Sequence, residues 1–455
     1  MGVFTPPVYI EYILRTLTES GYDAFLVGGC VRDSVMGRTA HDWDVATSAS
    51  PSGVSSVFEK TVLSGEKYGT VIVILPEGTA EVTTFRAESG YSDGRRPGSV
   101  TFVKSLDEDL SRRDFTMNAI AASLSGELTD PFGGFADIND RLIRCVGDPG
   151  ERFGEDALRM FRAFRFRAEL GFTIEEGTLA SIYENSGRAG LISAERVRVE
   201  LERTLLSAMP EVTGDILEAG LLAGYLPFPV SAPPGLERIA ALPEESGLRW
   251  CAFCALLIDR GLIEDAGLLL RKLRLDAKTI KTCSSALSIA DFPDHSFWRS
   301  AADPAHCDGS VICGGRSKLS LRDDDPLRTE QIQRIKIKRL LAKFGTQAVR
   351  CAAAASDTLR GAPDTGCPAQ SSGAEVSELV FDCPALETVD RIIGNGECFS
   401  LRTLAVSGSD LILSGRPPGR GIGETLAALL DHVIERPEDN VRGVLLKIVE
   451  ESGKT

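Results

Sequence analysis

The feature that most constrains the fold is a short apolar run at residues 22–27, which ends at Gly28 and Gly29 and continues into a helix-like segment. A helical pattern at residues 9–17 precedes it. A strand that turns into a helix at two glycines is typical of α/β architecture, because glycine permits the sharp change of direction. We therefore predict that the chain begins with a sheet and flanking helices.

The following segments extend this sheet. Apolar runs of β type occur at residues 71–75, 80–85 and 99–103, with glycine- and proline-containing turns between them, and a helix is predicted at residues 115–122. One mixed sheet with flanking helices accounts for residues 1–150.

Beyond residue 150 the pattern changes to helical spacing. Two stretches of small and turn-forming residues, 302–325 and 352–374, are predicted to be loops or joints. The predicted helical segments are residues 155–170, 194–206, 236–242, 248–257, 263–273 and 331–344. The fold class is therefore α+β, with the sheet first and a mostly helical remainder.

Charge and hydropathy exclude several classes of protein. The chain has 455 residues, and its 65 acidic and 50 basic side chains give a formal net charge of −15. This argues against a protein that coats nucleic acid through bulk electrostatics, although local basic surfaces are compatible with it. No segment has about 18 consecutive uncharged apolar residues, and the first residues lack the pattern of an export signal. We expect a cytoplasmic protein with no membrane partner.

The distribution of cysteines also indicates the cytoplasm. Eleven cysteines are spread without a pairing pattern, which predicts reduced thiols. The pair Cys251 and Cys254 lies in an apolar helical run, and no further ligands follow at zinc spacing. We interpret this pair as part of a hydrophobic core.

Gly28, Gly29 and Arg32 form the first candidate site. Exposed backbone amides at a helix start, helped by an arginine, favour negative charge and can bind a triphosphate. The alternative is an ordinary tight turn between a strand and a helix.

Asp42 and Asp44 form the second candidate site. If they lie on a strand, alternation places both carboxylates on one face, about 7 Å apart. Oxygen ligands in this arrangement suit Mg²⁺, and two such ions can activate an attacking hydroxyl and neutralise a leaving pyrophosphate. Glu81, on a later β-type run, is a candidate third carboxylate. The alternative is a solvated edge or turn.

Residues 112–119 form the third candidate site. Arg112 and Arg113 are assigned to nucleotide phosphate or base, and Asp114 with Asn118 to the sugar hydroxyls of a ribonucleotide. In the alternative interpretation, Asp114 caps the following helix and the arginines are solvated.

The order and spacing of these motifs resemble a known family. The chain contains LVGGCVRDSVMGRTAHDWDVATSASP, then TTFRAESGYSDGRRPGSVTF, then RRDFTMNAIA, and the likeness continues through ERFGEDALRMFRAFRFRAELGF to SAERVRVELERTLL. Residues 22–206 resemble the class II tRNA nucleotidyltransferases (CCA-adding enzymes) and bacterial poly(A) polymerases of the DNA polymerase β superfamily. A weaker likeness to the tail of the bacterial CCA-adding enzymes lies in PGRGIGETLAALLDHVIERPEDNVRGVLL.

The resemblance implies an architecture and a set of roles. The expected domains are a catalytic, polymerase-β-like head at residues 1–150, a neck at 151–206, a body at 207–330 and a tRNA-binding tail at 331–455. The implied cofactor is Mg²⁺, held by Asp42 and Asp44, with Glu81 as a further catalytic residue. The implied nucleotide-binding residues are Gly28, Gly29, Arg32, Arg113, Asp114, Asn118, Glu155, Asp156, Arg159 and Arg162.

Glu155, Asp156 and Arg159 have two interpretations. A Glu-to-Arg pair four residues apart is common on an exposed helix. Helical spacing also places Asp156 and Arg159 on one face, where an acceptor and a donor can meet the edge of one base. C and A offer an amine to the carboxylate, whereas G and U have a carbonyl there. In the family, this edge of the protein replaces a nucleic-acid template.

Two segments distinguish activities within the family. Residues 63–71 are closer to the GxxxGTV form of CCA-adding enzymes than to the poly(A) polymerase segment, and the loop at residues 88–98 has full length, unlike that of CC-adding enzymes. We expect complete CCA addition to the tRNA 3′ end from CTP and ATP, with no DNA partner. The alternatives are poly(A) polymerase, a CC-adding or A-adding enzyme and, more remotely, a non-catalytic RNA-binding protein.

Basic side chains alternate with apolar ones in three clusters, at residues 159–167, 196–203 and 334–343. They are candidate phosphate contacts or, alternatively, solvated helix faces.

Overall fold

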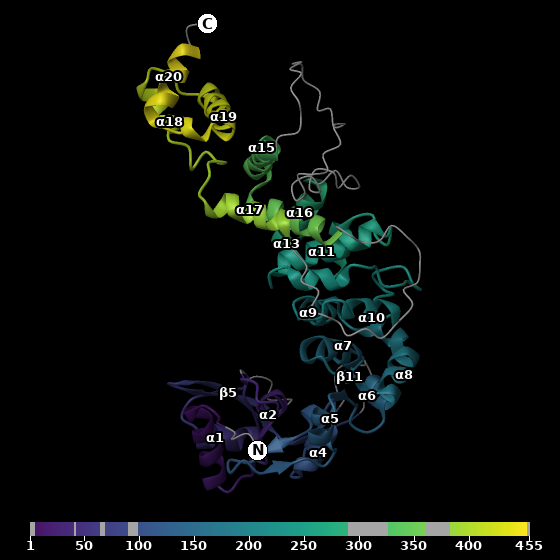
Figure 1. Cartoon of the computed structure of the whole chain (residues 1–455). Helices are drawn as coiled ribbons and strands as arrows, with labels where there is room; N and C mark the ends of the chain where they lie inside the picture. Colours follow the sequence, from purple (N-terminus) through teal and green to yellow (C-terminus); the bar gives the residue numbers. More distant parts are fainter. Residues whose placement is uncertain are drawn as a thin grey trace. The chain divides into compact units, whose positions relative to one another are not determined.

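The computed structural model describes residues 5–40, 42–63, 69–89, 99–289, 326–359 and 383–452. The chain forms two compact units, Met1–Ala232 and Pro233–Thr455. Strands lie in the purple and blue part of the ribbon, and helices build the teal to yellow part (Figure 1). The predicted α+β class is confirmed, whereas the division into four domains stays a prediction.

Unit 1 contains a mixed sheet of seven strands in the order β3-β4-β5-β2-β1-β8-β9. β2 and β5 are parallel, and the other neighbouring pairs are antiparallel. The strands of this sheet are β1 Ala24–Val27, β2 Asp44–Thr47, β3 Thr61–Leu63, β4 Thr70–Leu75, β5 Gly78–Thr84, β8 Ala121–Ala122 and β9 Leu128–Thr129. Two smaller sheets pair β6 Arg86–Ser89 with β7 Ser99–Phe102, and β10 Leu142–Ile143 with β11 Thr173–Ile174.

Short helices pack against the sheet. α1, Val8–Glu19, buries Ile10, Ile13, Leu14 and Leu17, whose spacing places them on one face of the helix. The other helices of this part are α2 Gly29–Val35, α3 Pro51–Val57, α4 Leu106–Ser111 and α5 Gly134–Asn139. α1 and α2 contact β1, and α3 contacts β4 and β5.

Five helices complete unit 1 and follow the sheet in sequence. α7 packs on both α9 and α10, and α6 packs on α8. Their bounds are α6 Pro149–Glu155, α7 Leu158–Leu170, α8 Glu176–Asn185, α9 Ala194–Leu205 and α10 Val212–Glu218.

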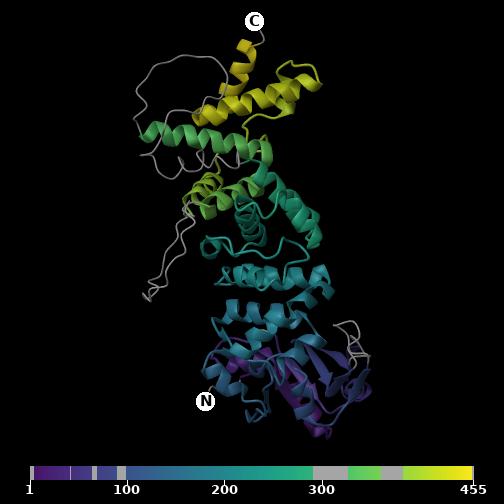
Figure 2. The ribbon, with the colours of Figure 1, turned by 90° about the vertical axis from the view of Figure 1, so that its right-hand side faces the viewer.

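The described part of unit 2 contains helices joined by loops, and no strand, as both views show (Figure 1, Figure 2). α16, Thr346–Leu359, is its central helix, because it packs against α11, α13, α15 and α17. The other helices are α11 Ser246–Asp259, α12 Ala266–Lys272, α13 Ala277–Ile289, α15 Pro326–Phe344, α17 Pro384–Gly394, α18 Gly408–Leu413, α19 Arg420–Glu435 and α20 Arg442–Ser452. None of the described helices is both long and apolar enough to cross a bilayer.

Cys251 and Cys254 lie fully buried in α11, which confirms their assignment to the core. The eight cysteines that the structure describes are free thiols.

The helix predicted at residues 115–122 is wrong. The segment forms a 3₁₀ turn, Thr116–Asn118, and then β8, which pairs with the end of β1. Gly134 of α5 packs directly beneath this turn: a Cβ atom at Gly134 would lie 2.0 Å from the backbone oxygen of Thr116. Pairing with β1 and this close approach of backbone override the local helical pattern.

Three other predictions need correction. The helix predicted at residues 155–170 is interrupted at Asp156, between α6 and α7. Residues 236–242 form a 3₁₀ helix, Leu236–Ala241, and the predicted loop at 352–374 begins inside α16. Residues 302–325 and 360–374 lie outside the described residues, as do residues 64–68 and 90–98 of the segments used to distinguish activities.

Candidate active site

The predicted triphosphate cradle lies where β1 ends. Gly28 has φ +78°, a left-handed conformation that favours glycine. A Cβ atom at Gly28 would lie 3.3 Å from Nη1 of Arg113 and 3.7 Å from Oδ2 of Asp44. The site needs a glycine here for its backbone conformation, and the missing side chain leaves this space open between an arginine and a carboxylate.

The sheet brings the predicted carboxylates to the same place. Asp44 is the first residue of β2, and its register neighbours are Val27 of β1 and Glu81 of β5. Asp42 precedes the strand, so the two aspartates do not alternate within one strand as predicted. Asp42, Asp44 and Glu81 are all exposed.

The pKa of Asp44 is raised. Displacement of water by the surrounding protein contributes most, Arg113 opposes it, and the negative charges of Glu81 and Asp42 raise the pKa further. Two further acidic groups thus act on Asp44, and among the described residues Arg113 offsets them, an arrangement that favours a bound cation.

These residues fit Mg²⁺ in one particular way. Within the described parts of the chain, no three His, Cys, Asp or Glu side chains are grouped so that they alone could hold a metal ion. Mg²⁺ commonly takes one or two protein carboxylates and completes its shell with substrate phosphates and water. Asp42 and Asp44 beside the triphosphate cradle match that requirement.

Asp109 was missed from the sequence. It is 1% exposed and binds Arg112 through two donor atoms, at 2.7 and 3.0 Å, and Nη2 of Arg113 at 3.2 Å. Burial raises its pKa, but the two arginines lower it more, so the net shift is downward. The spacing of three and four residues within a helical turn was the signal for this contact.

Asp114, Asn118 and Arg32 are buried and form one network with the half-buried Arg162. Arg162 Nε donates to Asp114 Oδ2 at 2.7 Å, Asn118 Nδ2 donates to Asp114 Oδ1 at 3.0 Å, and Arg32 Nη1 donates to Asn118 Oδ1 at 2.8 Å. Burial raises the pKa of Asp114, but Arg162, Asn118 and Arg159 bring it well below its ordinary value. The structure therefore joins the predicted ribose contacts to the predicted phosphate contact.

Arg159 lies beside this network and is itself held. Its Nη1 binds Glu155 Oε2 at 2.6 Å, and its Nη2 donates to the backbone oxygen of Arg112 at 2.8 Å. The Glu155–Arg159 pair considered from sequence is thus present. Arg159 is only 8% exposed, however, so the pair does not lie on a solvated helix face.

Asp156 lies in the break between α6 and α7, in an extended conformation. Its Oδ1 accepts the backbone N–H of Leu158 at 3.1 Å, and both of its oxygens bind Arg196 of α9, at 3.1 and 2.7 Å. The helical spacing assumed for Asp156 and Arg159 is therefore wrong. The role of Arg196 was also missed, because a contact across 40 residues leaves no local pattern.

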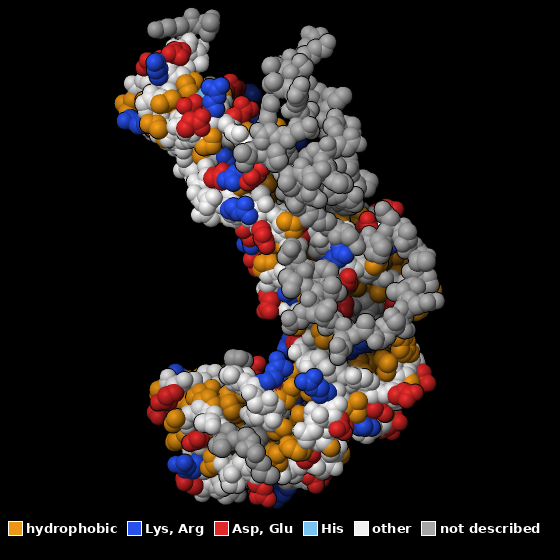
Figure 3. Space-filling model, in the orientation of Figure 1, with side chains coloured by type: hydrophobic (Ala, Val, Ile, Leu, Met, Phe, Trp, Pro, Cys, Tyr) orange, Lys and Arg blue, Asp and Glu red, His pale blue; other side chains and the backbone are white. Residues whose placement is uncertain are grey.

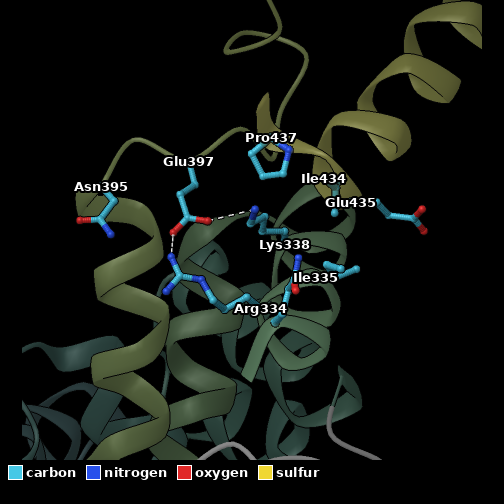
Figure 4. Close-up of a pocket in the computed structure, with 9 residues that line it drawn as sticks. Arg334, Ile335, Lys338, Asn395, Glu397, Ile434, Glu435 and Pro437 are labelled. Atoms are coloured by element: carbon cyan, nitrogen blue, oxygen red, sulfur yellow. Dashed lines mark hydrogen bonds and ion pairs between the residues drawn. The ribbon is translucent and has the colours of Figure 1, made fainter. Parts of the chain in front are cut away.

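The basic clusters are largely paired with acids. Arg196 pairs with Asp156, Arg198 with Glu202 and Arg203 with Glu169. In unit 2, Glu397 binds both Arg334 and Lys338 of α15 in a small pocket (Figure 4). Acidic and basic side chains are interspersed over the face in Figure 3. Phosphate contact by these clusters stays a prediction.

Two family models match unit 1. The family described as "Poly A polymerase head domain" matches residues 24–144, and the one described as "Probable RNA and SrmB- binding site of polymerase A" matches residues 171–230.

Solved structures resemble the chain over almost its whole length. The crystal structure of the Bacillus stearothermophilus CCA-adding enzyme in complex with CTP has 31% sequence identity and a TM-score of 0.70, and covers 99% of both chains. That of the Thermotoga maritima CCA-adding enzyme complexed with tRNA has 18% identity and a TM-score of 0.65, with 99% and 97% covered, and shares the fold.

Curated relatives carry the same name. A CCA-adding enzyme from a Geobacillus species is 45% identical over 292 residues, 63% of this chain and 71% of the relative. That of Geobacillus kaustophilus is 37% identical over 437 residues, 94% of this chain and 93% of the relative. With this identity over nearly the full length of both proteins, the chain belongs to the CCA-adding enzyme family.

Proposed function

We propose that this protein adds CCA to the 3′ end of tRNA without a nucleic-acid template, using CTP and ATP and releasing pyrophosphate. The observation that carries the proposal is the meeting of Gly28, Arg113 and Asp44 at one point of the sheet, within 3.3–3.7 Å of the position of a Cβ atom on Gly28. The names of the family's relatives support the same activity. A tRNA substrate leads us to propose the cytoplasm as the compartment.

The head residues supply binding and charge. Asp42 and Asp44 would hold Mg²⁺, which when bound neutralises the triphosphate and lowers the pKa of the attacking hydroxyl. Arg32 and Arg113 bind the phosphates beside Gly28 and Gly29. The tRNA 3′ oxygen forms a bond to the α-phosphorus, the bond from that phosphorus to the β-phosphate oxygen breaks, and the hydroxyl proton passes to water. Glu81 adds negative charge at the same strand edge.

Residues at the junction of α6 and α7 select the base. We assign acceptance of the amine of C or A to Asp156, which Arg196 orients, and donation to a ring nitrogen or carbonyl to Arg159, which Glu155 orients. We assign the ribose contacts to Asp114, Asn118 and Arg162, which are joined by hydrogen bonds to one another and to Arg32. Burial lowers the pKa of Arg162, but Asp114, Glu200 and, less strongly, Asp156 raise it, so the net shift is upward. This effect of Asp156 on Arg162 supports a base edge that lies near the ribose network.

The decisive experiment uses three tRNA transcripts that lack the last three, two or one nucleotides. Each is incubated with CTP, ATP or both in the presence of Mg²⁺, and the products are sequenced. We expect CC from CTP on the shortest transcript, A from ATP on the longest, and CCA from both. Repeated A addition would show a poly(A) polymerase, and one missing step a CC-adding or A-adding enzyme. No extension of any transcript would overturn the proposal.

A further inference from the structure

Three guanidinium groups converge on the ring of Phe166 in α7. The central carbons of Arg32, Arg162 and Arg165 lie 5.1, 5.3 and 4.1 Å from the ring centroid. Phe166 is 4% exposed, and the ring of Phe115 meets it nearly perpendicularly at 5.8 Å. Cations within about 6 Å of an aromatic ring are attracted by the negative charge of its face, and more strongly where water is excluded.

Hydrogen bonds hold the edge of the Arg32 guanidinium group, and the ring of Phe166 supports its face. Its Nε and Nη2 donate to one oxygen of Asp33, at 2.9 and 2.8 Å, and Nη1 donates to Asn118. These bonds use the edge of the guanidinium group, whereas Phe166 acts from its distance of 5.1 Å as a separate support. A Cβ atom at Gly29 would lie 3.7 Å from Nη2 of Arg32, so the supported group borders the phosphate cradle.

We infer that Phe166 is a positioning residue that holds Arg32 for the triphosphate through its aromatic face. The inference rests on the proposed function, because it deepens the role assigned to Arg32. Phosphates are common to CTP and ATP, so Phe166 supports both substrates equally and has no part in the choice of base.

Other phenylalanines of the same helix provide a matched control. Phe161 and Phe164 are 0% exposed, and no described cation lies over their rings. Truncation of Phe164 therefore removes packing from α7 without removing a support from Arg32. A merely structural role of Phe166 predicts that Phe166→Leu and Phe164→Leu have the same effects.

The experiment compares Phe166→Leu, Phe166→Tyr and Phe164→Leu in the full chain. For Phe166→Leu we expect the KM for CTP and for ATP to rise together, about tenfold, with their ratio and kcat changed much less, since the loss of one desolvated cation–π contact has about this size. Phe166→Tyr keeps the ring and is expected to restore most of the affinity. Phe164→Leu is expected to stay within twofold of wild type in KM.

A binding measurement separates this inference from the proposed activity. Inorganic tripolyphosphate is the probe, and its dissociation constant is measured by calorimetry. We expect Phe166→Leu to weaken tripolyphosphate about as much as CTP, even in a protein that failed to extend tRNA. Unchanged tripolyphosphate binding, or equal losses in Phe166→Leu and Phe164→Leu, would overturn the inference.

A second series covers the case in which Phe166→Leu does not fold. Mono-, di- and trifluorinated phenylalanine at position 166 keep the size of the ring nearly constant and progressively weaken the charge on its face. A stepwise loss of tripolyphosphate affinity with fluorine number supports the inference, and affinities independent of fluorine number contradict it.

Discussion

Asp44 occupies a position that is unfavourable to its own charge. Because its pKa is raised in the folded protein, the ionised carboxylate is less stable there than in the unfolded chain at neutral pH. Asp114 is the opposite case, since its pKa is lowered by Arg162, Asn118 and Arg159. Two aspartates of one site thus have opposite effects on stability.

Asparagine substitutions should separate activity from stability. We expect Asp42→Asn and Asp44→Asn to abolish the addition of both C and A, because each removes a proposed Mg²⁺ ligand. Asp44→Asn should unfold at the same temperature as wild type or higher. Asp114→Asn should lose roughly 1.5–3 kcal/mol of unfolding free energy, because it removes the charge that accepts the hydrogen bond of the half-buried Arg162. Nucleotide incorporation and thermal unfolding are the two measurements.

Asp140→Asn is the matched control for these variants. Asp140 is exposed at the end of α5, and the same chemical change there should leave both measurements unaltered. Full incorporation by Asp42→Asn or Asp44→Asn would remove the assigned metal site, and a large drop in the unfolding temperature of Asp44→Asn would contradict the electrostatic argument.

At the scale of elements, the break between α6 and α7 sets the geometry of the proposed base-reading edge. A continuous helix would tie Asp156 to the same rigid frame as Arg159. In the structure, Asp156 is instead held by Arg196 of α9, and Arg159 by the end of α6 and the backbone of Arg112. The edge therefore depends on the packing of α7 against α9 and α6.

The combined change Asp156→Ala with Arg159→Ile should relax the selection of the base. Mispaired buried polar groups cost roughly 1–3 kcal/mol each, and removing those groups removes the penalty against UTP and GTP. We expect CTP and ATP to be used less well, UTP and GTP relatively better, and tripolyphosphate binding to be kept. Incorporation of all four nucleotides on one tRNA measures this.

Arg198→Ala provides the comparison. Arg198 lies on α9 beside Arg196 but pairs with Glu202, so its loss should leave selection unchanged. A double variant that kept the wild-type preference for CTP and ATP would return Asp156 and Arg159 to purely structural roles.

Local patterns predicted much of the sheet and the site, but not the contacts between distant residues. The apolar runs located β1, β4, β5 and β7 to within a few residues, because a buried strand is a short run of apolar residues that are consecutive in the sequence. The helix predicted at residues 115–122 was wrong because β8 exists only through its pairing with β1. No sequence pattern indicated a role for Phe166, because the three arginines that contact its ring come from both near and distant parts of the chain.

At the scale of the whole molecule, lowered carboxyl pKa values occur in both units. In unit 2, contacts with Ser407 contribute most and Arg442 contributes further, and together they lower the pKa of Asp410 from 3.8 to about 2. In unit 1 the pKa of Asp114 is also lowered. A carboxyl group whose folded pKa lies below its unfolded pKa contributes stability above the unfolded value and loses it as the pH falls toward the folded value.

A fall in pH should therefore lower the stability of both units. Substitution of one carboxyl group shows how much of this loss comes from that group. We expect Asp410→Asn to be less stable than wild type at about pH 6, and the difference to shrink as the pH falls from about 4 toward 2. Urea unfolding of the full chain at a series of pH values, followed by fluorescence, measures the difference. The exposed Asp140→Asn should show no such trend. A deficit of Asp410→Asn that stayed constant over this range would contradict the assignment.

The close contact at Gly134 makes the proposed nucleotide site sensitive to a mutation at a residue without a side chain. Any side chain there would displace the backbone of Thr116, and with it the turn that carries Asn118, the partner of Arg32. Gly134, which has no side chain, thus sets the position of Asn118, a proposed ribose contact. A lineage that acquired alanine at this position would lose nucleotide binding through a displaced backbone, with every predicted catalytic side chain still encoded in its gene.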